Sequence, residues 1–92
     1  MHLEIVTPEA TLFSGEVESV AVPGVNGEFE MLKNHAPIVS LLKEGYVKIF
    51  GDIQLEEEFE DKFEKGKDRG TWLEINSGTI EMKDNKVIVL AD

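Results

Sequence analysis

Apolar and polar residues alternate along most of the chain in short runs, which is the pattern of strands with one buried face. Residues 3–6, 28–31, 46–50 and 71–75 alternate in this way, and Phe, Trp, Tyr, Ile and Val are frequent in them. Residues 86–90, "KVIVL", are apolar on both faces, which predicts a central strand. The pattern therefore predicts an all-β protein.

Turn residues separate these runs at intervals of about 8–12 residues, a spacing typical of an antiparallel sandwich or barrel. Asn26-Gly27 and Asp84-Asn85 are the predicted hairpin tips, because Asn, Asp and Gly tolerate a positive φ. The other breaks are Thr7-Pro8, Ser14-Gly15, Pro23-Gly24, Gly45, Gly51-Asp52 and Ser77-Gly78. Residues 1–92 are expected to form one domain with one two-layer core.

Residues 51–70, "GDIQLEEEFEDKFEKGKDRG", do not fit the strand pattern. Leu55, Phe59 and Phe63 recur every four residues, as on one helix face, but with Ile53 they also occupy odd positions, as on one strand face. The periodicity leaves both structures open. Because predicted strands flank the segment, we favour an acidic, protruding hairpin or loop.

The formal net charge of −10 limits the partners of such a domain. A surface of this sign repels nucleic acid and anionic lipid headgroups, and it favours basic protein surfaces. The chain has no cysteine, which excludes disulfides and zinc–thiolate sites. The first ten residues do not resemble a signal peptide, and no run is long enough to span a bilayer, so a cytoplasmic location is expected.

Candidate catalytic residues are few. His35 and Ser40 could form part of a hydrolytic site, and residues 40–43, "SLLK", match S-x-x-K, but the other motifs of those enzymes are missing. The acids Glu56, Glu57 and Glu58 lack the spacing of an EF-hand and are typical of a solvated face. We expect no catalytic residue, no metal site and no cofactor. His35 precedes Ala36-Pro37, and proline holds this corner extended, so the histidine is predicted to serve as a docking corner.

Two long stretches carry a family resemblance: "TPEATLFSGEVESVAVPGVNGEFEMLKNHAPIVSLLKEGYVKI" and "INSGTIEMKDNKVIVLAD". Together they resemble the N-terminal β-sandwich domain of the epsilon subunit of F-type ATP synthases. The resemblance covers about residues 3–50 and 71–92. The shared elements, in order, are Ser14-Gly15, Gly27-Glu28, Asn34-His35-Ala36-Pro37, Gly45, Ser77-Gly78 and Leu90-Ala91-Asp92.

The resemblance implies a flattened antiparallel β-sandwich of about ten short strands. It also implies a non-catalytic rotor subunit of a proton-transporting ATP synthase. Such a domain lies in the central stalk, peripheral to the inner face of the cell membrane, and couples the gamma subunit to the c-ring during ATP synthesis. The family's chain usually continues into a helical hairpin that can bind ATP. This sequence stops at Asp92, so no ATP binding is expected of it.

Residue roles are carried over from the resemblance alone. Glu28 matches the acid that faces the polar loops of the c-ring, and its neighbours Phe29 and Met31 are included in that surface. Thr7, His35 and Ser40 match positions that face gamma. Glu28 and His35 are expected to lie exposed near one end of the domain. Whether Phe29, Met31, Pro37 and Ile38 are core or contact residues stays open. The alternative function is a free-standing binding module that uses the acidic segment 51–70 to hold a basic protein or calcium.

Overall fold

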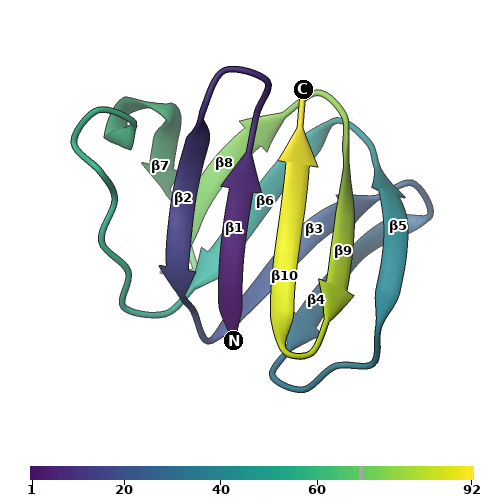
Figure 1. The fold of residues 1–92 in the computed structure, drawn as a ribbon. Helices are drawn as coiled ribbons and strands as arrows, with labels where there is room; N and C mark the ends of the chain where they lie inside the picture. Colours follow the sequence, from purple (N-terminus) through teal and green to yellow (C-terminus); the bar gives the residue numbers. More distant parts are fainter. Residues whose placement is uncertain (69) are drawn as a thin grey trace.

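The structure, a computed structural model, describes residues 1–68 and 70–92, and ten strands dominate it (Figure 1). The strands are β1 His2–Val6, β2 Thr11–Glu16, β3 Ser19–Gly24, β4 Gly27–Leu32, β5 Ile38–Leu42, β6 Gly45–Phe50, β7 Phe63–Lys65, β8 Thr71–Ile75, β9 Gly78–Lys83 and β10 Lys86–Ala91. One short 3-10 helix, η1 Glu60–Lys62, precedes β7. The prediction of an antiparallel β-sandwich of about ten short strands is confirmed.

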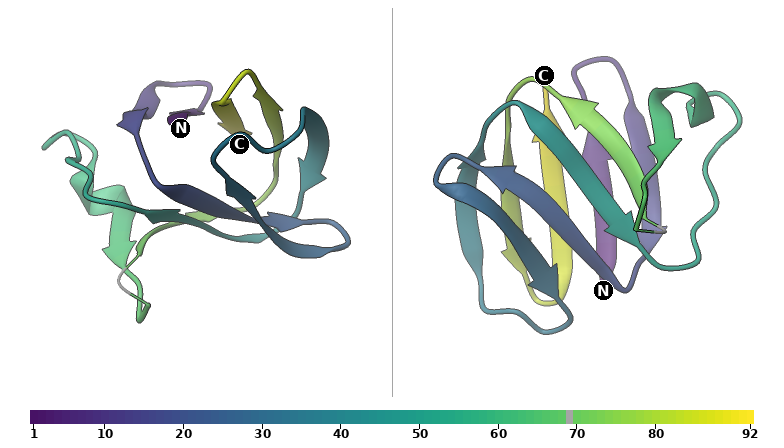
Figure 2. Two further views of the ribbon diagram at one scale, coloured as in Figure 1. Left: turned by 90° about the horizontal axis from the view of Figure 1, so that it is seen from below. Right: turned by 180° about the vertical axis from the view of Figure 1, so that it is seen from behind.

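The strands form two layers that face each other (Figures 1 and 2). The first sheet has the order β2-β1-β10-β9-β5, and the second contains β4-β3-β6-β8-β7. The two meet at a corner, where Gly24 of β3 pairs with Leu42 of β5. Strands β1 and β10 run parallel, so the first and last strands of the domain lie side by side in the first sheet.

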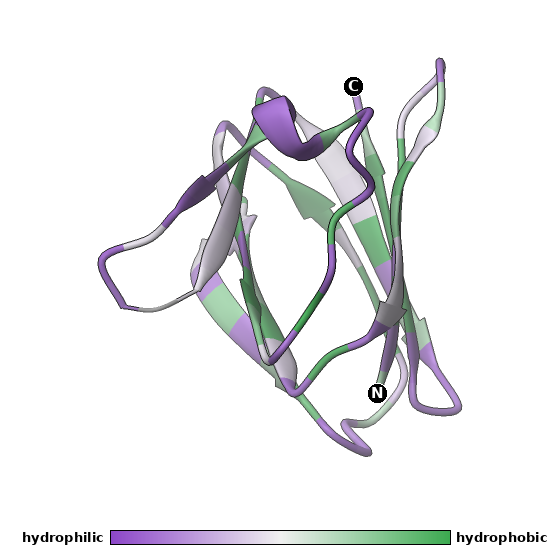
Figure 3. Cartoon of the chain, turned by 90° about the vertical axis from the view of Figure 1, so that its left-hand side faces the viewer, coloured by the Kyte–Doolittle hydropathy of each residue, from purple (hydrophilic) through white to green (hydrophobic). Residues whose placement is uncertain are grey.

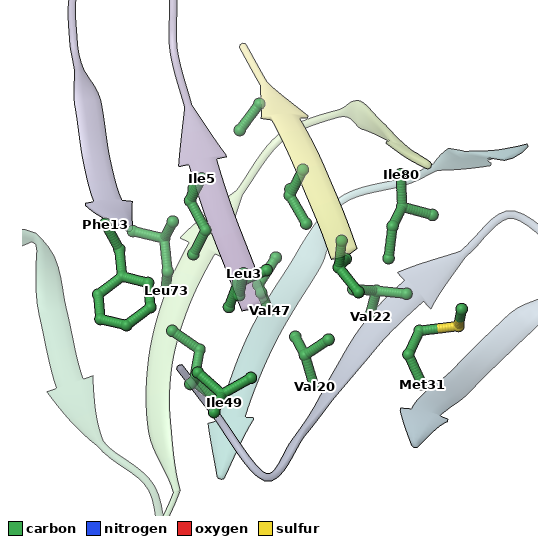
Figure 4. Packing of buried hydrophobic residues seen from close by; sticks show 14 of the residues in the cluster. Leu3, Ile5, Phe13, Val20, Val22, Met31, Val47, Ile49, Leu73 and Ile80 are labelled. Atoms are coloured by element: carbon green, nitrogen blue, oxygen red, sulfur yellow. The ribbon is translucent and has the colours of Figure 1, made fainter. Parts of the chain in front are cut away.

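Both sheets turn their apolar faces inward, and this shared core holds the domain together (Figure 4). The alternation seen in the sequence explains it, since every second residue of a strand points to the same face. Leu3 and Ile5 of β1 are completely buried, as are Val47 and Ile49 of β6. The other completely buried side chains include Val20, Val22, Met31, Ile80, Val87 and Val89.

Strand β10 has β1 and β9 as neighbours, so the prediction of a central strand at residues 86–90 is confirmed. The reason given for that prediction, burial of the strand on both faces, was wrong. Val87 and Val89 are buried, whereas Leu90 is 51% exposed on the outer face. The parallel neighbour β1 and the position in the sheet make β10 central, although only its inner face is covered.

The predicted hairpin tips are also found. Asp84 and Asn85 connect β9 to β10 with φ values of 52° and 61°. Residues 25–26 connect β3 to β4, and Gly27 directly after them has a φ of 125°, a left-handed value that side chains rarely adopt. The residue types at both tips therefore match the backbone geometry that the turns require.

The acidic segment forms a loop over residues 51–59, followed by η1 and by β7, which pairs with β8. Its apolar residues point to the core: Phe63 is only 9% exposed, and Ile53, Leu55 and Phe59 pack against the core cluster. Its acids point to solvent. Figure 3 shows this loop and η1 passing in front of the open side of the sandwich, between β2 and β7.

Candidate interaction surfaces

The outer face of the first sheet carries an exposed apolar patch. Val39 and Leu41 of β5 are 74% and 62% exposed, and Leu90 of β10 is 51% exposed. Leu41 pairs with Thr79 of β9, and Thr79 pairs with Leu90, so the three apolar side chains span neighbouring strands on one surface. We call Val39, Leu41 and Leu90 the apolar face. Contiguous exposed apolar residues mark interaction sites more often than isolated ones do.

Strand β5 produces this surface by an inverted pattern. Ile38 and Leu42 point inward, so by alternation Ser40 lies on their side of the strand while Val39 and Leu41 point to solvent. A strand that served only the core would place its polar residue outside. The inversion indicates that the outer face of β5 is shaped for contact with another molecule.

The three residues expected to face gamma lie along the first sheet without contacting one another. Thr7 is in the β1–β2 connection, where its Oγ1 donates to the carbonyl of Ala10 over 3.1 Å. Ser40 lies in the middle of β5, at the edge of the sheet. His35 lies in the β4–β5 connection, and Figure 1 shows this connection at the end of the sheet opposite to the β1–β2 connection.

The corner around His35 is held by local hydrogen bonds. Asn34 has a φ of 62°, and its amide donates to Oδ1 of Asn85 over 2.9 Å, which ties the corner to the β9–β10 turn. The His35 amide donates to the Leu32 carbonyl over 3.1 Å. The His35 ring is exposed, with Nδ1 2.8 Å from the carbonyl oxygen of Ala36. The exposed histidine is thus presented on a braced turn.

The three residues expected to face the ring divide between the two faces of β4. Glu28 is exposed on the outer face of the second sheet, and Phe29 is half-buried on the inner side. Met31 is completely buried, so it belongs to the core and offers no surface to a partner. Glu28 and His35 were also expected near one end of the molecule. They do not share one end: Glu28 is the second residue of β4, and His35 lies three residues beyond the other end of that strand.

The outer face of the second sheet is polar and satisfied by its own contacts. Lys48 Nζ lies 2.9 Å from Glu28 Oε1 and 4.4 Å from the centre of the Trp72 ring. The Trp72 ring lies 5.1 Å from that of Tyr46, and its indole Nε1 donates to Asp68 over 3.1 Å. These contacts join three strands, β4, β6 and β8, through side chains alone.

Two pKa shifts follow from the charges on this face. Desolvation raises the pKa of Asp68. Hydrogen bonds from the Gly70 amide and the Trp72 indole lower it, and together with the smaller contributions they outweigh desolvation, so the pKa is lowered overall. The negative charge of Glu64, and then that of Glu74, raises the pKa of Tyr46.

Neither His35 nor Ser40 has the contacts of a catalytic pair. Ser40 Oγ donates to the carbonyl of Leu41 over 3.3 Å, and the His35 ring contacts a carbonyl as well. Within residues 1–68 and 70–92, no group of three or more histidine, aspartate or glutamate side chains is placed to hold a metal ion.

The apolar face was not recognised from the sequence. Residues 38–42, "IVSLL", are apolar on both sides of the strand, and that pattern does not say which side is buried. The central serine would have misled the prediction, because a polar residue is ordinarily expected on the outer face, whereas Ser40 lies on the side of Ile38 and Leu42. The contacts among Glu28, Lys48 and Trp72 left no signal, because they join three separate strands.

A small β-sandwich with an apolar outer face and braced corner turns defines a class of β domain with a candidate interaction surface. Residues 1–92 match the family described as "ATP synthase, Delta/Epsilon chain, beta-sandwich domain", and the chain belongs to that family.

Relatives of different lengths share this domain. The chain is 44% identical over 92 residues to the ATP synthase epsilon chain of Campylobacter curvus and 41% identical to that of Campylobacter concisus, and it spans 60% of the length of each. It is 40% identical over 90 residues to the ATP synthase epsilon chain of Chlorobaculum tepidum and spans 86% of that protein.

Solved structures share the fold at low sequence identity. A chain of the Tetrahymena thermophila mitochondrial ATP synthase central stalk and c-ring superposes with a TM-score of 0.73 at 11% identity, over 98% of this chain and 61% of that one. A chain of the Euglena gracilis mitochondrial ATP synthase gives a TM-score of 0.72 at 15% identity, over 97% and 48% of the two chains. Within the described residues, no helix is long and apolar enough to cross a membrane.

Proposed function

We propose that this domain is a non-catalytic rotor part of a proton-transporting F-type ATP synthase. It would lie at the inner face of the membrane and couple the gamma subunit to the c-ring. The observation that carries the proposal is the family match over residues 1–92, with relatives that are ATP synthase epsilon chains. A part that transmits torque has to be stiff, and the closed core of two sheets supports such a role.

Gamma is proposed to dock on the first sheet. The apolar face supplies exposed apolar surface there, which a bound partner would shield from water, and its residue Leu41 directly follows Ser40. Thr7 and His35 mark the two ends of the same sheet, so a partner that covers its outer face would reach both of them. The side chain of Ser40 points to the other side of β5, so the partner would contact it only around the edge of that strand. An apolar centre with a polar rim is the usual anatomy of a specific interface.

The ring is proposed to contact the β3–β4 hairpin through Glu28, with Phe29 beside it. The Glu28 side chain is 52% exposed, so a basic residue of a ring loop can reach it although Lys48 already lies 2.9 Å away. An exposed pair of this kind contributes only about 0.2–1 kcal/mol. Its role would be to fix the register of the two surfaces more than to hold them together.

A binding assay with purified subcomplexes tests this function. The chain should be retained by immobilised gamma without nucleotide, and His35→Ala should weaken that binding. Glu28→Gln should weaken only binding to a subcomplex that also contains the c-ring, whereas Glu74→Gln, an exposed acid on β8, serves as the matched control. Failure of the unaltered chain to bind either subcomplex would refute the proposal.

A further inference from the structure

Strand β2 ends the first sheet and has one free edge. Its one partner within residues 1–68 and 70–92 is β1. The Val17 amide donates to the Met1 carbonyl over 2.8 Å, so by the two-residue alternation of an antiparallel ladder Gly15 and Phe13 also face β1. The backbone groups of Ser14 and Glu16 therefore point away from the sheet, where a further strand could pair with them.

A groove runs along this free edge. It has a volume of about 770 Å³, and residues 11–14 of β2 form one wall while residues 54–57 and Glu60 form the other. Ser14 and Thr11 are exposed in it, whereas Leu12 and Phe13 are buried beneath. The volume is within the range of roughly 300–1,000 Å³ that is typical of ligand sites.

The second wall is acidic and anchored. Glu56, Glu57 and Glu60 line the groove and are exposed, and none of them forms an ion pair within the part of the chain that the structure describes. Leu55, just before these acids, and Phe59, between Glu57 and Glu60, pack against the core, which fixes the wall opposite β2. The groove thus combines unpaired backbone groups on one side with uncompensated negative charge on the other.

We propose that this groove binds an extended peptide segment rich in lysine or arginine, which adds to β2 as an outer strand. Strand addition supplies main-chain hydrogen bonds, and side chains on one face of the added strand supply specificity. Basic side chains on that face would meet Glu56, Glu57 and Glu60. The partner is a protein with an exposed basic strand or tail. This binding goes beyond the rotor function and does not depend on it.

The edge of β7 shows why the proposal falls on β2. Strand β7 ends the second sheet, but it has three residues, two of which, Glu64 and Lys65, are charged and exposed. A short, charged edge is how proteins prevent pairing with other strands. Strand β2 is twice as long, with six residues, and presents Thr11, Ser14 and Glu16 at its exposed positions, of which only Glu16 is charged.

Isotope-labelled chain and a synthetic peptide test the proposal. The probe is a peptide of about eight residues in which lysine alternates with threonine or valine. We expect the amide signals of Ser14 and Glu16 to shift on titration and their hydrogen exchange to slow, because both amides gain an acceptor. A matched peptide with glutamate in place of lysine should not bind.

Two further comparisons separate strand addition from simple charge attraction. A lysine peptide that is N-methylated on the residues facing β2 keeps its charge but cannot donate to the strand, and it should bind about tenfold more weakly. The triple variant Glu56→Gln, Glu57→Gln and Glu60→Gln should also lose about tenfold in affinity. The control variant Glu18→Gln, Glu44→Gln and Glu74→Gln has the same net charge and should stay within about twofold.

The proposal is overturned by any of three results: no binding of the lysine peptide, equal binding of the N-methylated peptide, or equal losses in the two triple variants. Equal binding of the N-methylated peptide would mean that it does not pair with the edge of β2. Equal losses in the two triple variants would mean that the net negative charge, and not the acids of the groove, attracts the peptide. Because the probe is a free peptide, a negative result here leaves the binding to gamma and the ring untouched.

Discussion

The two outer faces of the sandwich are built in opposite ways. The outer face of the second sheet is satisfied within the chain, since Lys48 contacts both Glu28 and Trp72. The outer face of the first sheet leaves the apolar side chains of Val39 and Leu41 largely exposed, at 74% and 62%. The contrast indicates that one face stabilises the domain, while the other is kept available for a partner.

Substitutions on the inner faces of the two sheets should cause the largest loss of unfolding free energy, against which substitutions on the outer faces can be compared. Ile49 of β6 is completely buried, so Ile49→Ala should lower the free energy of unfolding by about 2–5 kcal/mol through lost burial and a cavity. Urea unfolding measures it. A loss below about 1 kcal/mol would mean that the two sheets are not packed as described.

Substitutions on the outer face of the second sheet should cause a smaller but measurable loss of unfolding free energy. Trp72→Leu keeps an apolar side chain but removes the ring under Lys48 and the indole donor to Asp68, which should cost about 1–2 kcal/mol of unfolding free energy. In a double-mutant cycle with Lys48→Met, the coupling energy should be about 0.5–1 kcal/mol. Additive single effects would show that the two side chains do not interact in solution.

The apolar face on the outside of the first sheet should contribute little to the unfolding free energy. The double variant Val39→Thr and Leu41→Thr keeps strand-forming residues and removes apolar surface that is already exposed, so the unfolding free energy should change by less than about 0.5 kcal/mol per site. Thermal and urea unfolding of the isolated chain provide the test. A large destabilisation would place these side chains in the core of the domain and remove the contrast between the faces.

A surface cluster at the start of the chain should give the smallest effect. The hydrogen bond from His2, together with that from the terminal amino group, lowers the pKa of the exposed Glu16 carboxyl from its ordinary value of 4.5. A lowered pKa in the folded state means that the small stabilisation is complete above about pH 4.5 and is lost as the pH falls through the folded value. A carboxyl titration by NMR should give a midpoint below 4.5 that rises in His2→Ala. An unchanged midpoint in the variant would exclude His2 as the cause.

The sequence was sufficient for what depends on local patterns. Alternation identified most of the strands, and Asp84-Asn85 marked a turn that requires two left-handed residues. The fold class followed from these, and the resemblance supplied the strand count. Glu28 and His35 were correctly expected to be exposed.

What the sequence did not reveal depends on how distant strands meet. Met31 and Glu28 lie on the same strand, and only the position of the second sheet shows that Met31 is inside. The outward direction of Leu41 depends on the pairing of β5 with β9. The groove at the free edge of β2 depends on the path of residues 51–62. Alternation gives the two faces of a strand but not which of them the fold covers.

The most direct test of the central claim is the affinity for purified gamma of three forms of the chain: unaltered, Val39→Thr with Leu41→Thr, and Trp72→Leu. If the first sheet is the docking face, the first two forms should differ by about tenfold or more in Kd, while Trp72→Leu stays within about twofold of the unaltered chain. Equal affinity of the Val39→Thr and Leu41→Thr variant, or a loss confined to Trp72→Leu, would contradict the assignment of the apolar face as the surface kept for a partner.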